Sequence, residues 1–514
     1  MRRSLVLAIA VVVVVALLGT GGLVALSLGS AGTRTASPST RPSEAAPAPA
    51  AIAWRPCTDS ELSSAGAECA SVRTPLDWAH PRDGRTVSIA ISRVRHTASP
   101  YSGVMLANPG GPGGSGLGLA TQGAQVPRRV GVRYDWVGFD PRDVGASRPR
   151  LTCDADYANG PRPQYTPATE DAVSAWRRRS DAYAKSCAGN GALLQHMTTR
   201  DSANDLDYLR RALGVRTVSY YGYSYGTYLG QVYATLYPDR LKRMVLDSTV
   251  DPGRVWYDAN LDQDRALDTA ITAWFDWLAE HDDRYRLGTT RKDVEQAYLD
   301  LGADLASKPA DGVFGSSELA DTLLYAGYSQ RLWPALGGAL ATAARGDTAA
   351  ARSYWTTLND VTDDNEYAAY LAVECTEAPW PRDWATWDRD TRRVDADAPF
   401  STWLNTWFNA PCRTWPAAAS TPVRVRGSAA PPILMIDETL DAATPYAGSV
   451  AVRRLFPRAR LLAEPGGTSH AESLSGNACV DGAVADYLGS GALPARAAGD
   501  GPDATCRPLP VPSP

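Results

Sequence analysis

The stretch Val218-Ser-Tyr-Tyr-Gly222-Tyr-Ser224-Tyr-Gly226-Thr-Tyr-Leu-Gly230 decides the fold. It passes from an apolar run that predicts a strand, residues 218–221, into a run that predicts a helix, residues 227–237. Ser224 lies at the turn between them, with a glycine two residues before it and another two residues after it. Small residues there make room for the sharp turn that holds a serine hydroxyl out of a sheet as a nucleophile. The alternative is a glycine-rich turn with an idle serine.

A nucleophilic serine needs a general base, and His470 is the histidine whose position suits that role. It follows the last predicted strand, residues 460–462, in the loop Glu464-Pro-Gly-Gly-Thr-Ser-His470. A base on such a loop can reach over the nucleophile. The alternative is a histidine in a surface loop. The other four histidines lie in loops, in a polar segment or at the end of a predicted helix: His80, His96, His196 and His281.

The acid of the triad is expected between Ser224 and His470, after an earlier strand. Asp437, Glu438 and Asp441 all follow the predicted strand 433–436. Asp441 lies in the loop, four residues clear of the strand end, whereas Asp437 abuts the strand and is expected to cap the turn. We therefore predict that Asp441 orients the imidazole and stabilises its protonated form.

A second glycine-rich segment, Asn108-Pro-Gly110-Gly111-Pro-Gly113-Gly114-Ser-Gly116, directly follows the predicted strand 104–108. Backbone N–H groups in such a turn can point at a developing oxyanion without obstruction by side chains. We predict an oxyanion hole made of Gly110, Gly111 and the N–H of Tyr225. A phosphate-binding loop is the alternative, but the segment lacks the Lys-Ser/Thr pair and the spacing into a long helix.

Short apolar runs alternate with helical stretches over most of the chain, which predicts an α/β-hydrolase fold, a mainly parallel sheet flanked by helices. The strand pattern stops at about residue 252 and resumes near residue 421. We expect residues 252–419 to form a helical cap, inserted before the last strands of a core made of residues 54–251 and 420–514. Other expected strands are 87–91, 134–139 and 243–246, and other expected helices are 202–213, 266–281, 291–306 and 483–488.

The N-terminus has the pattern of an export signal. Arg2 and Arg3 precede an uncharged apolar stretch from residue 5 to about residue 28. That stretch is long enough to span a bilayer, so residues 1–30 are either a signal peptide or a signal anchor, and membrane anchoring stays open. Residues 31–53 are rich in Ala, Pro and Ser and predict an extended linker. The protein is expected to be secreted, or anchored outside the cytoplasm in the cell envelope.

Charge and cysteine content narrow the possible functions. The net charge is −5 and no long basic run occurs, so nucleic-acid binding is not indicated. The even number of cysteines suits disulfides in an oxidising compartment, and their spacing predicts no metal site. Sequential pairing would close four modest loops, and we specifically expect the last four cysteines to pair in that order. The eight are Cys57, Cys69, Cys153, Cys187, Cys375, Cys412, Cys479 and Cys506.

From Trp54 to Cys506 the chain resembles the bacterial secreted tripeptidyl aminopeptidases, which are related to the prolyl iminopeptidases. It departs from them in two places: Asp143 stands where the family commonly has glycine, and the loop before Asp441 is not the usual glycine-rich one. The segments that carry the resemblance are Cys69-Ala-Ser-Val-Arg-Thr-Pro-Leu-Asp-Trp, the two glycine-rich segments quoted above, Val137-Gly-Phe-Asp-Pro-Arg-Asp-Val-Gly, Thr198-Thr-Arg-Asp, Asp441-Ala-Ala-Thr-Pro and the run from His470 to Cys506.

The resemblance implies a serine exopeptidase that needs no cofactor and releases short peptides, typically tripeptides, from free N-termini. A buried substrate ammonium needs a compensating carboxylate. Glu374 and Glu377 of the cap are the candidates, and the alternative is that both are ordinary solvated acids. Two other functions compete: an exported esterase or lipase with the same triad, and a catalytically inactive surface-binding protein.

Overall fold

The computed structural model describes residues 45–159, 162–359 and 363–514. The predicted signal peptide or anchor and most of the predicted linker lie outside these residues. Within the described ranges, no helix is long and apolar enough to cross a membrane.

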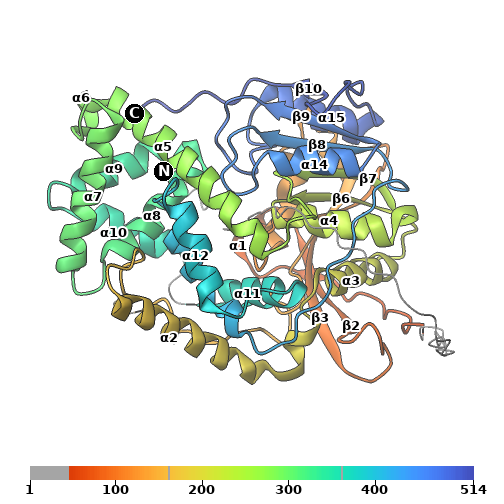
Figure 1. Ribbon diagram of the computed structural model, residues 1–514. Coiled ribbons are helices and arrows are strands. Elements are labelled where there is room, and N and C mark those ends of the chain that lie inside the picture. Colours follow the sequence, from red (N-terminus) through yellow and green to blue (C-terminus); the bar gives the residue numbers. More distant parts are fainter. Residues whose placement is uncertain (1–44, 160–161, 360–362) are drawn as a thin grey trace, which may run out of the picture.

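The strands of the described chain form a single sheet in the order β1-β2-β3-β5-β4-β6-β7-β8-β9-β10 (Figure 1). Seven of them confirm predicted strands, whereas β1, β2 and β10 were not predicted. The strands are β1 (Arg55–Pro56), β2 (Glu68–Pro75), β3 (Thr86–Val94), β4 (Gly103–Asn108), β5 (Tyr134–Phe139), β6 (Val218–Tyr223), β7 (Leu241–Asp247), β8 (Ile433–Glu438), β9 (Ala459–Glu464) and β10 (Ala504–Thr505).

The pairing of these strands confirms the mainly parallel sheet of an α/β hydrolase. Three strand pairs are antiparallel: β1 with β2, β2 with β3, and β3 with β5. All further pairs along the sheet, from β5 through β4, β6, β7, β8 and β9 to β10, are parallel. Parallel strands present their carboxyl ends at one edge of a sheet, which is where such folds bind ligands. Every residue of β6 and β8 is buried, because helices cover both faces of the sheet.

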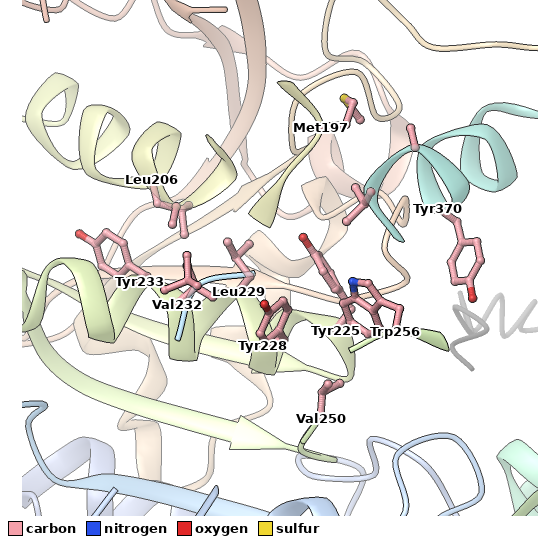
Figure 2. Packing of buried hydrophobic residues seen from close by; sticks show 14 of the residues in the cluster. Met197, Leu206, Tyr225, Tyr228, Leu229, Val232, Tyr233, Val250, Trp256 and Tyr370 are labelled. Atoms are coloured by element: carbon pink, nitrogen blue, oxygen red, sulfur yellow. The ribbon is translucent and has the colours of Figure 1, made fainter. Parts of the chain in front are cut away.

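Helices pack on both faces of the sheet. Figure 2 shows the side chains of Tyr228, Leu229 and Val232 on one side of α4, with Leu206 of α3 opposite them. This packing holds α4, the helix that follows Ser224, against the rest of the core. The helices outside the insertion are α1 (Ser60–Ser64), α2 (Glu170–Cys187), α3 (Thr199–Ala212), α4 (Tyr225–Leu236), α14 (Ala447–Leu455) and α15 (Ala478–Ser490).

Between β7 and β8 the chain is helical, as predicted, and several of its helices gather in a lobe beside the sheet (Figure 1). The lobe has a hydrophobic cluster of its own. The helices are α5 (Asn260–Glu280), α6 (Asp282–Tyr285), α7 (Arg291–Ser307), α8 (Ser316–Tyr328), α9 (Trp333–Ala343), α10 (Ala349–Leu358), α11 (Asn365–Glu377), α12 (Trp384–Asp395) and α13 (Thr402–Asn409). We call this insertion the cap; its exact bounds stay a prediction.

Helix α2, which the predicted bounds assign to the core, packs against the cap. Trp176 of α2 stacks on Trp407 of α13 with ring centroids 5.7 Å apart.

Four disulfides close the loops that sequential pairing predicts. They join Cys57 to Cys69, Cys153 to Cys187, Cys375 to Cys412, and Cys479 to Cys506. The described chain has no free cysteine. Disulfides of this number are typical of proteins outside the cytoplasm.

Candidate active site

Ser224 occupies a strained backbone position between β6 and α4. Its φ is 54° and its ψ is −128°, a conformation that residues other than glycine rarely adopt. Its N–H donates to the carbonyl of Asp247 (3.0 Å), and its carbonyl accepts from the Thr227 hydroxyl (2.6 Å). These bonds fix the turn that the sequence predicts.

The two glycines around Ser224 are required by close approach of the backbone. A Cβ on Gly222 would lie 2.5 Å from the carbonyl oxygen of Gly226, and one on Gly226 would lie 2.7 Å from that of Asn108. Both distances are shorter than any real contact. The glycine spacing is therefore a consequence of how tightly β6, α4 and the loop after β4 meet.

The predicted oxyanion loop lies directly against Ser224. A Cβ on Gly110 would meet the Cβ of Ser224 at 2.8 Å and the nitrogen of Tyr225 at 3.0 Å. However, the N–H of Gly110 donates to Oδ1 of Asn108 (3.1 Å). This bond counts against Gly110 as an oxyanion donor and leaves the N–H groups of Gly111 and Tyr225 as the candidates.

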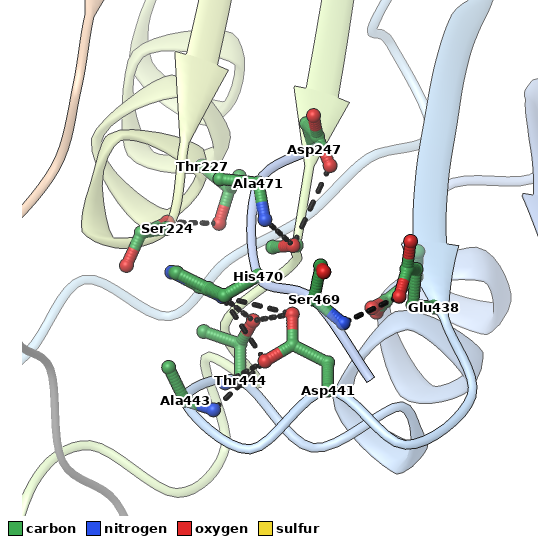
Figure 3. A network of polar contacts seen from close by, with 12 residues as sticks. Ser224, Thr227, Asp247, Glu438, Asp441, Ala443, Thr444, Ser469, His470 and Ala471 are labelled. Atoms are coloured by element: carbon green, nitrogen blue, oxygen red, sulfur yellow. Dashed lines mark hydrogen bonds and ion pairs between the residues drawn. The ribbon is translucent and has the colours of Figure 1, made fainter. Parts of the chain in front are cut away.

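His470 and Asp441 are in contact, 29 residues apart in sequence. Nδ1 of His470 lies 2.8 Å from Oδ2 and 3.0 Å from Oδ1 of Asp441 (Figure 3). The Asp441 carboxylate also accepts from the N–H of Ala443 (2.8 Å) and from the N–H and hydroxyl of Thr444 (2.9 and 3.1 Å). The turn after Asp441 thus holds the carboxylate in place for the imidazole. Sequence analysis missed Thr444, whose Oγ1 lies 3.4 Å from Nδ1 of His470.

Asp437 and Glu438 serve other contacts. Oδ2 of Asp437 accepts from the Ser449 hydroxyl (2.5 Å), and burial, with the nearby Asp441, holds the pKa of Asp437 well above its usual range. Oε2 of Glu438 accepts from the N–H of Ser469, next to His470. Of the three acids that follow β8, Asp441 is therefore the one that contacts the imidazole.

The reactive atoms of Ser224 and His470 are buried. Figure 3 shows the His470 ring directed toward Ser224. Oγ of Ser224 and Nε2 of His470 are both buried and have no hydrogen-bond partner among the described residues. Catalytic hydrogen bonds are often absent without substrate and form in the Michaelis complex. Ser224 as a whole is only 1% exposed.

Buried carboxyls surround the loop of His470, and sequence analysis gave Asp247 and Glu464 no role there. Asp247, at the end of β7, accepts from the N–H of Ser473 (2.9 Å), and burial raises the pKa of Asp247 to about 6. Glu438 and Glu464 lie opposite each other on β8 and β9. Burial, and then the charge of Glu464, raises the pKa of Glu438 to about 9, while burial and Asp247 raise that of Glu464 to about 8. At neutral pH the loop of His470 therefore lies beside two protonated carboxyls, those of Glu438 and Glu464.

The two candidate ammonium ligands differ sharply, and neither is solvated. Glu374 Oε2 accepts from the hydroxyl of Tyr370 (3.1 Å), while Oε1 is buried and has no partner among the described residues. Burial holds the pKa of Glu374 well above its usual range. Glu377 instead accepts from the N–H of Thr199 (2.5 Å) and the hydroxyl of Tyr228 (3.3 Å). Glu377 therefore anchors the start of α3, which counts against it as a substrate ligand.

Asp143, where the resembling family commonly has glycine, has a φ of 68°, in the region that favours glycine. Its carbonyl accepts from the side chain of Asn365 (2.9 Å) and the N–H of Leu151 (3.1 Å). Burial raises the pKa of its carboxyl to about 7. The backbone of Asp143 therefore bonds the first residue of α11, Asn365, to the core.

The amino-acid sequence of the chain is similar to those of several known proteins. Residues 398–506 match a family model described as TAP-like protein. A tripeptidyl aminopeptidase of Streptomyces coelicolor is 40% identical over 480 residues, covering 90% of this chain and 87% of that protein. The serine protease Hip1 of Mycobacterium tuberculosis is 31% identical over 474 residues (86% and 89%). A carboxylesterase B of the same species is 31% identical over 471 residues (86% and 88%).

Proposed function

The chain belongs to the tripeptidyl aminopeptidase family, and from that premise we propose that it is an exported serine exopeptidase releasing short peptides, tripeptides in the first place, from free N-termini. The observation that carries the proposal is the contact of His470 with Asp441 beside a strained Ser224. The family relationship supplies the reaction class. The four disulfides support a site of action outside the cytoplasm, either secreted or anchored through the N-terminal segment.

In this proposal Ser224 Oγ attacks the scissile carbonyl while Nε2 of His470 takes its proton. Asp441 holds the imidazole by its Nδ1–H and stabilises the imidazolium, and His470 then returns the proton to the leaving amine. The N–H groups of Gly111 and Tyr225 stabilise the oxyanion. Water hydrolyses the acyl-enzyme in the second half of the cycle.

The proposed ligand for the substrate's free amine is Glu374. Its Oε1 is a buried acceptor without a partner in the described chain, and an ammonium would satisfy it. The Tyr370 hydroxyl bonded to Glu374 also contacts Oδ1 of Asn409 (2.9 Å), so further polar groups surround the carboxyl. An arriving ammonium would draw the carboxyl into its charged form, because a buried charge is stable only when it is paired.

The test compares a tripeptide p-nitroanilide bearing a free amine with its N-acetylated form. Acetylation removes the charge, so kcat/KM should fall by about tenfold or more, the value of one charge-assisted hydrogen bond. Equal rates on the two substrates would reject recognition of the N-terminus.

An esterase is the second candidate, because one relative of similar coverage is named a carboxylesterase. Fatty-acyl p-nitrophenyl esters, assayed beside the peptide substrates, separate the two functions. A kcat/KM on esters above that on every free-amine peptide would favour the esterase.

A further inference from the structure

The loop that carries His470, residues 465–477 between β9 and α15, is bonded to two different parts of the molecule. Core groups hold most of its N–H donors: Glu438 accepts from Ser469, Oγ of Ser248 accepts from Ala471 (2.8 Å), and Asp247 accepts from Ser473. The N–H of His470 itself is the exception. It donates to the carbonyl of Tyr328 (2.9 Å), the last residue of cap helix α8.

The connection between α8 and α9, residues 328–332, makes further bonds to the same loop. We call this segment the cap junction. The N–H of Gln330 donates to the Ser469 hydroxyl (3.3 Å), and the Ser329 hydroxyl donates to Oε1 of Glu472 (3.4 Å). The Tyr328 ring also meets the imidazole of His470 edge to face, with centroids 5.8 Å apart. The junction therefore contacts the base at both its backbone and its ring.

Arg331 completes this contact with a charge. Its Nη2 lies 3.0 Å from Oε2 of Glu472 and donates to the carbonyl of Ser475 (2.6 Å). The Glu472 side chain is 7% exposed and that of Arg331 is 35% exposed, so the pair is partly shielded from solvent. A guanidinium that joins a carboxylate and a carbonyl of one loop fixes the loop's orientation as well as its distance.

Backbone strain shows that the loop needs such support. Ala471, directly after His470, has a φ of 59°, and Leu474 has a φ of 62°. Residues other than glycine keep this conformation only when the surrounding contacts impose it. Contacts from the cap and the core together impose it here.

We propose that the cap junction is a positioning element for His470, so that the catalytic base is in place only while the cap is seated on the core. The inference rests on the proposed function. Ser224 is buried, and a displacement of the junction when substrate enters would release the N–H of His470. Reseating the cap over a bound peptide then restores the base, which couples substrate binding to catalysis.

The charge on the junction makes this role measurable. The titratable groups around His470 are Asp441 from the turn after β8, Glu438 from β8, Asp247 from β7, Glu472 from its own loop and Tyr328 from the cap junction, with Arg331 of the junction paired to Glu472. Arg331 is the one cation in this set. Removing it leaves Glu472 unpaired and favours a proton on the imidazole, which moves the acidic limb of the kcat/KM profile to higher pH by a few tenths of a unit.

The experiment measures kcat, KM and the pH profile of kcat/KM on a free-amine tripeptide p-nitroanilide. Arg331→Met should lower kcat by about tenfold or more with little change in KM, because a misplaced base costs rate rather than binding. It should also shift the acidic limb upward. Arg331→Lys keeps the positive charge, so its acidic limb should lie at the same pH as that of the wild type. Glu472→Gln removes the carboxylate and should shift the limb downward.

Arg291→Met is the matched control, since it breaks a cap ion pair, with Asp276, that lies away from the loop. The proposal is overturned if Arg331→Met keeps the kcat and the acidic limb of this control, whatever its thermal stability. If Arg331→Met does not fold, Glu472→Gln takes its place. The proposal is then overturned if Glu472→Gln keeps the kcat and the acidic limb of the control. Failure of the wild-type protein to react with a fluorophosphonate would reject the proposed function itself, whereas a reactive wild type with unaffected variants rejects only the junction.

Discussion

The carboxyl end of the sheet and the cap supply the candidate site by different means. In the core, Ser224 depends mainly on the turn from β6 to α4, and Asp441 on N–H groups of its own turn. In the cap, Glu374 lies within α11 and depends on a neighbouring helix, through Tyr370 and Asn409. We infer that core residues determine whether the reaction occurs, and that cap residues determine which substrates undergo it.

The largest effect should follow removal of the nucleophile or the base. Ser224→Ala or His470→Ala should each lower kcat by about 10⁴-fold or more on peptides and esters alike, and the double variant should lose little beyond either single one. Steady-state kinetics on both substrate classes measures this. Wild-type turnover by Ser224→Ala would break the assignment of chemistry to the core.

The next effect separates two acids that are four residues apart in sequence, Asp437 and Asp441. Asp441→Asn should lower kcat by about 10⁴-fold, because an amide favours the wrong tautomer of His470. Asp437→Asn should lower kcat by less than about tenfold, since the Asp437 carboxyl bonds to Ser449 and not to His470. Kinetics of the purified variants decides. Equal losses would mean that contact with the imidazole does not identify the acid.

A smaller effect tests the cap. Glu374→Gln should reduce the preference for a free amine over an acetylated one by about tenfold, without a matching loss on esters. Glu377→Gln is the control on the same helix. Its carboxylate bonds to Thr199, so the substitution should lower the unfolding temperature and leave the preference unchanged. If the preference follows Glu377 instead, our choice between the two acids is wrong.

The smallest effect concerns stability. Glu438 has a folded-state pKa of about 9, so between its ordinary value near 4.5 and pH 9 the unfolded chain binds fewer protons than the native one. Stability contributed by the neutral carboxyl is therefore lost as pH rises through this window. Glu438→Gln keeps an acceptor for Ser469 and removes the titration.

The variant should unfold about 1–3 °C above the wild type at pH 8 and should show a flatter pH dependence. Differential scanning calorimetry from pH 5 to pH 9 measures this. A lower unfolding temperature at pH 8 would show that the ionised carboxylate stabilises the loop.

The prediction from sequence succeeded where a pattern is local. The seven predicted strands lie in the sheet because their apolar runs are continuous, whereas β2 was missed because Glu68–Pro75 contains few large apolar residues and forms a strand only by pairing with β3. The order of Ser224, Asp441 and His470 was predicted, and their geometry agrees with it. The donor role of Gly110 was not excluded, since nothing in the sequence shows that Asn108 takes its N–H.

The sequence by itself determined seven strands of the sheet, the turn at Ser224 and the place of His470 after β9. Each of these depends on residue type at a short spacing, because strand, turn and glycine requirements are local. Only the tertiary structure decided that Glu377 anchors α3 while Glu374 keeps a free acceptor, and that the cap junction reaches the His470 loop. Ser329 and Glu472, which join there, are 143 residues apart in sequence. Contacts across such separations depend on how the packed helices and sheet are oriented, and no local pattern of side chains encodes that orientation.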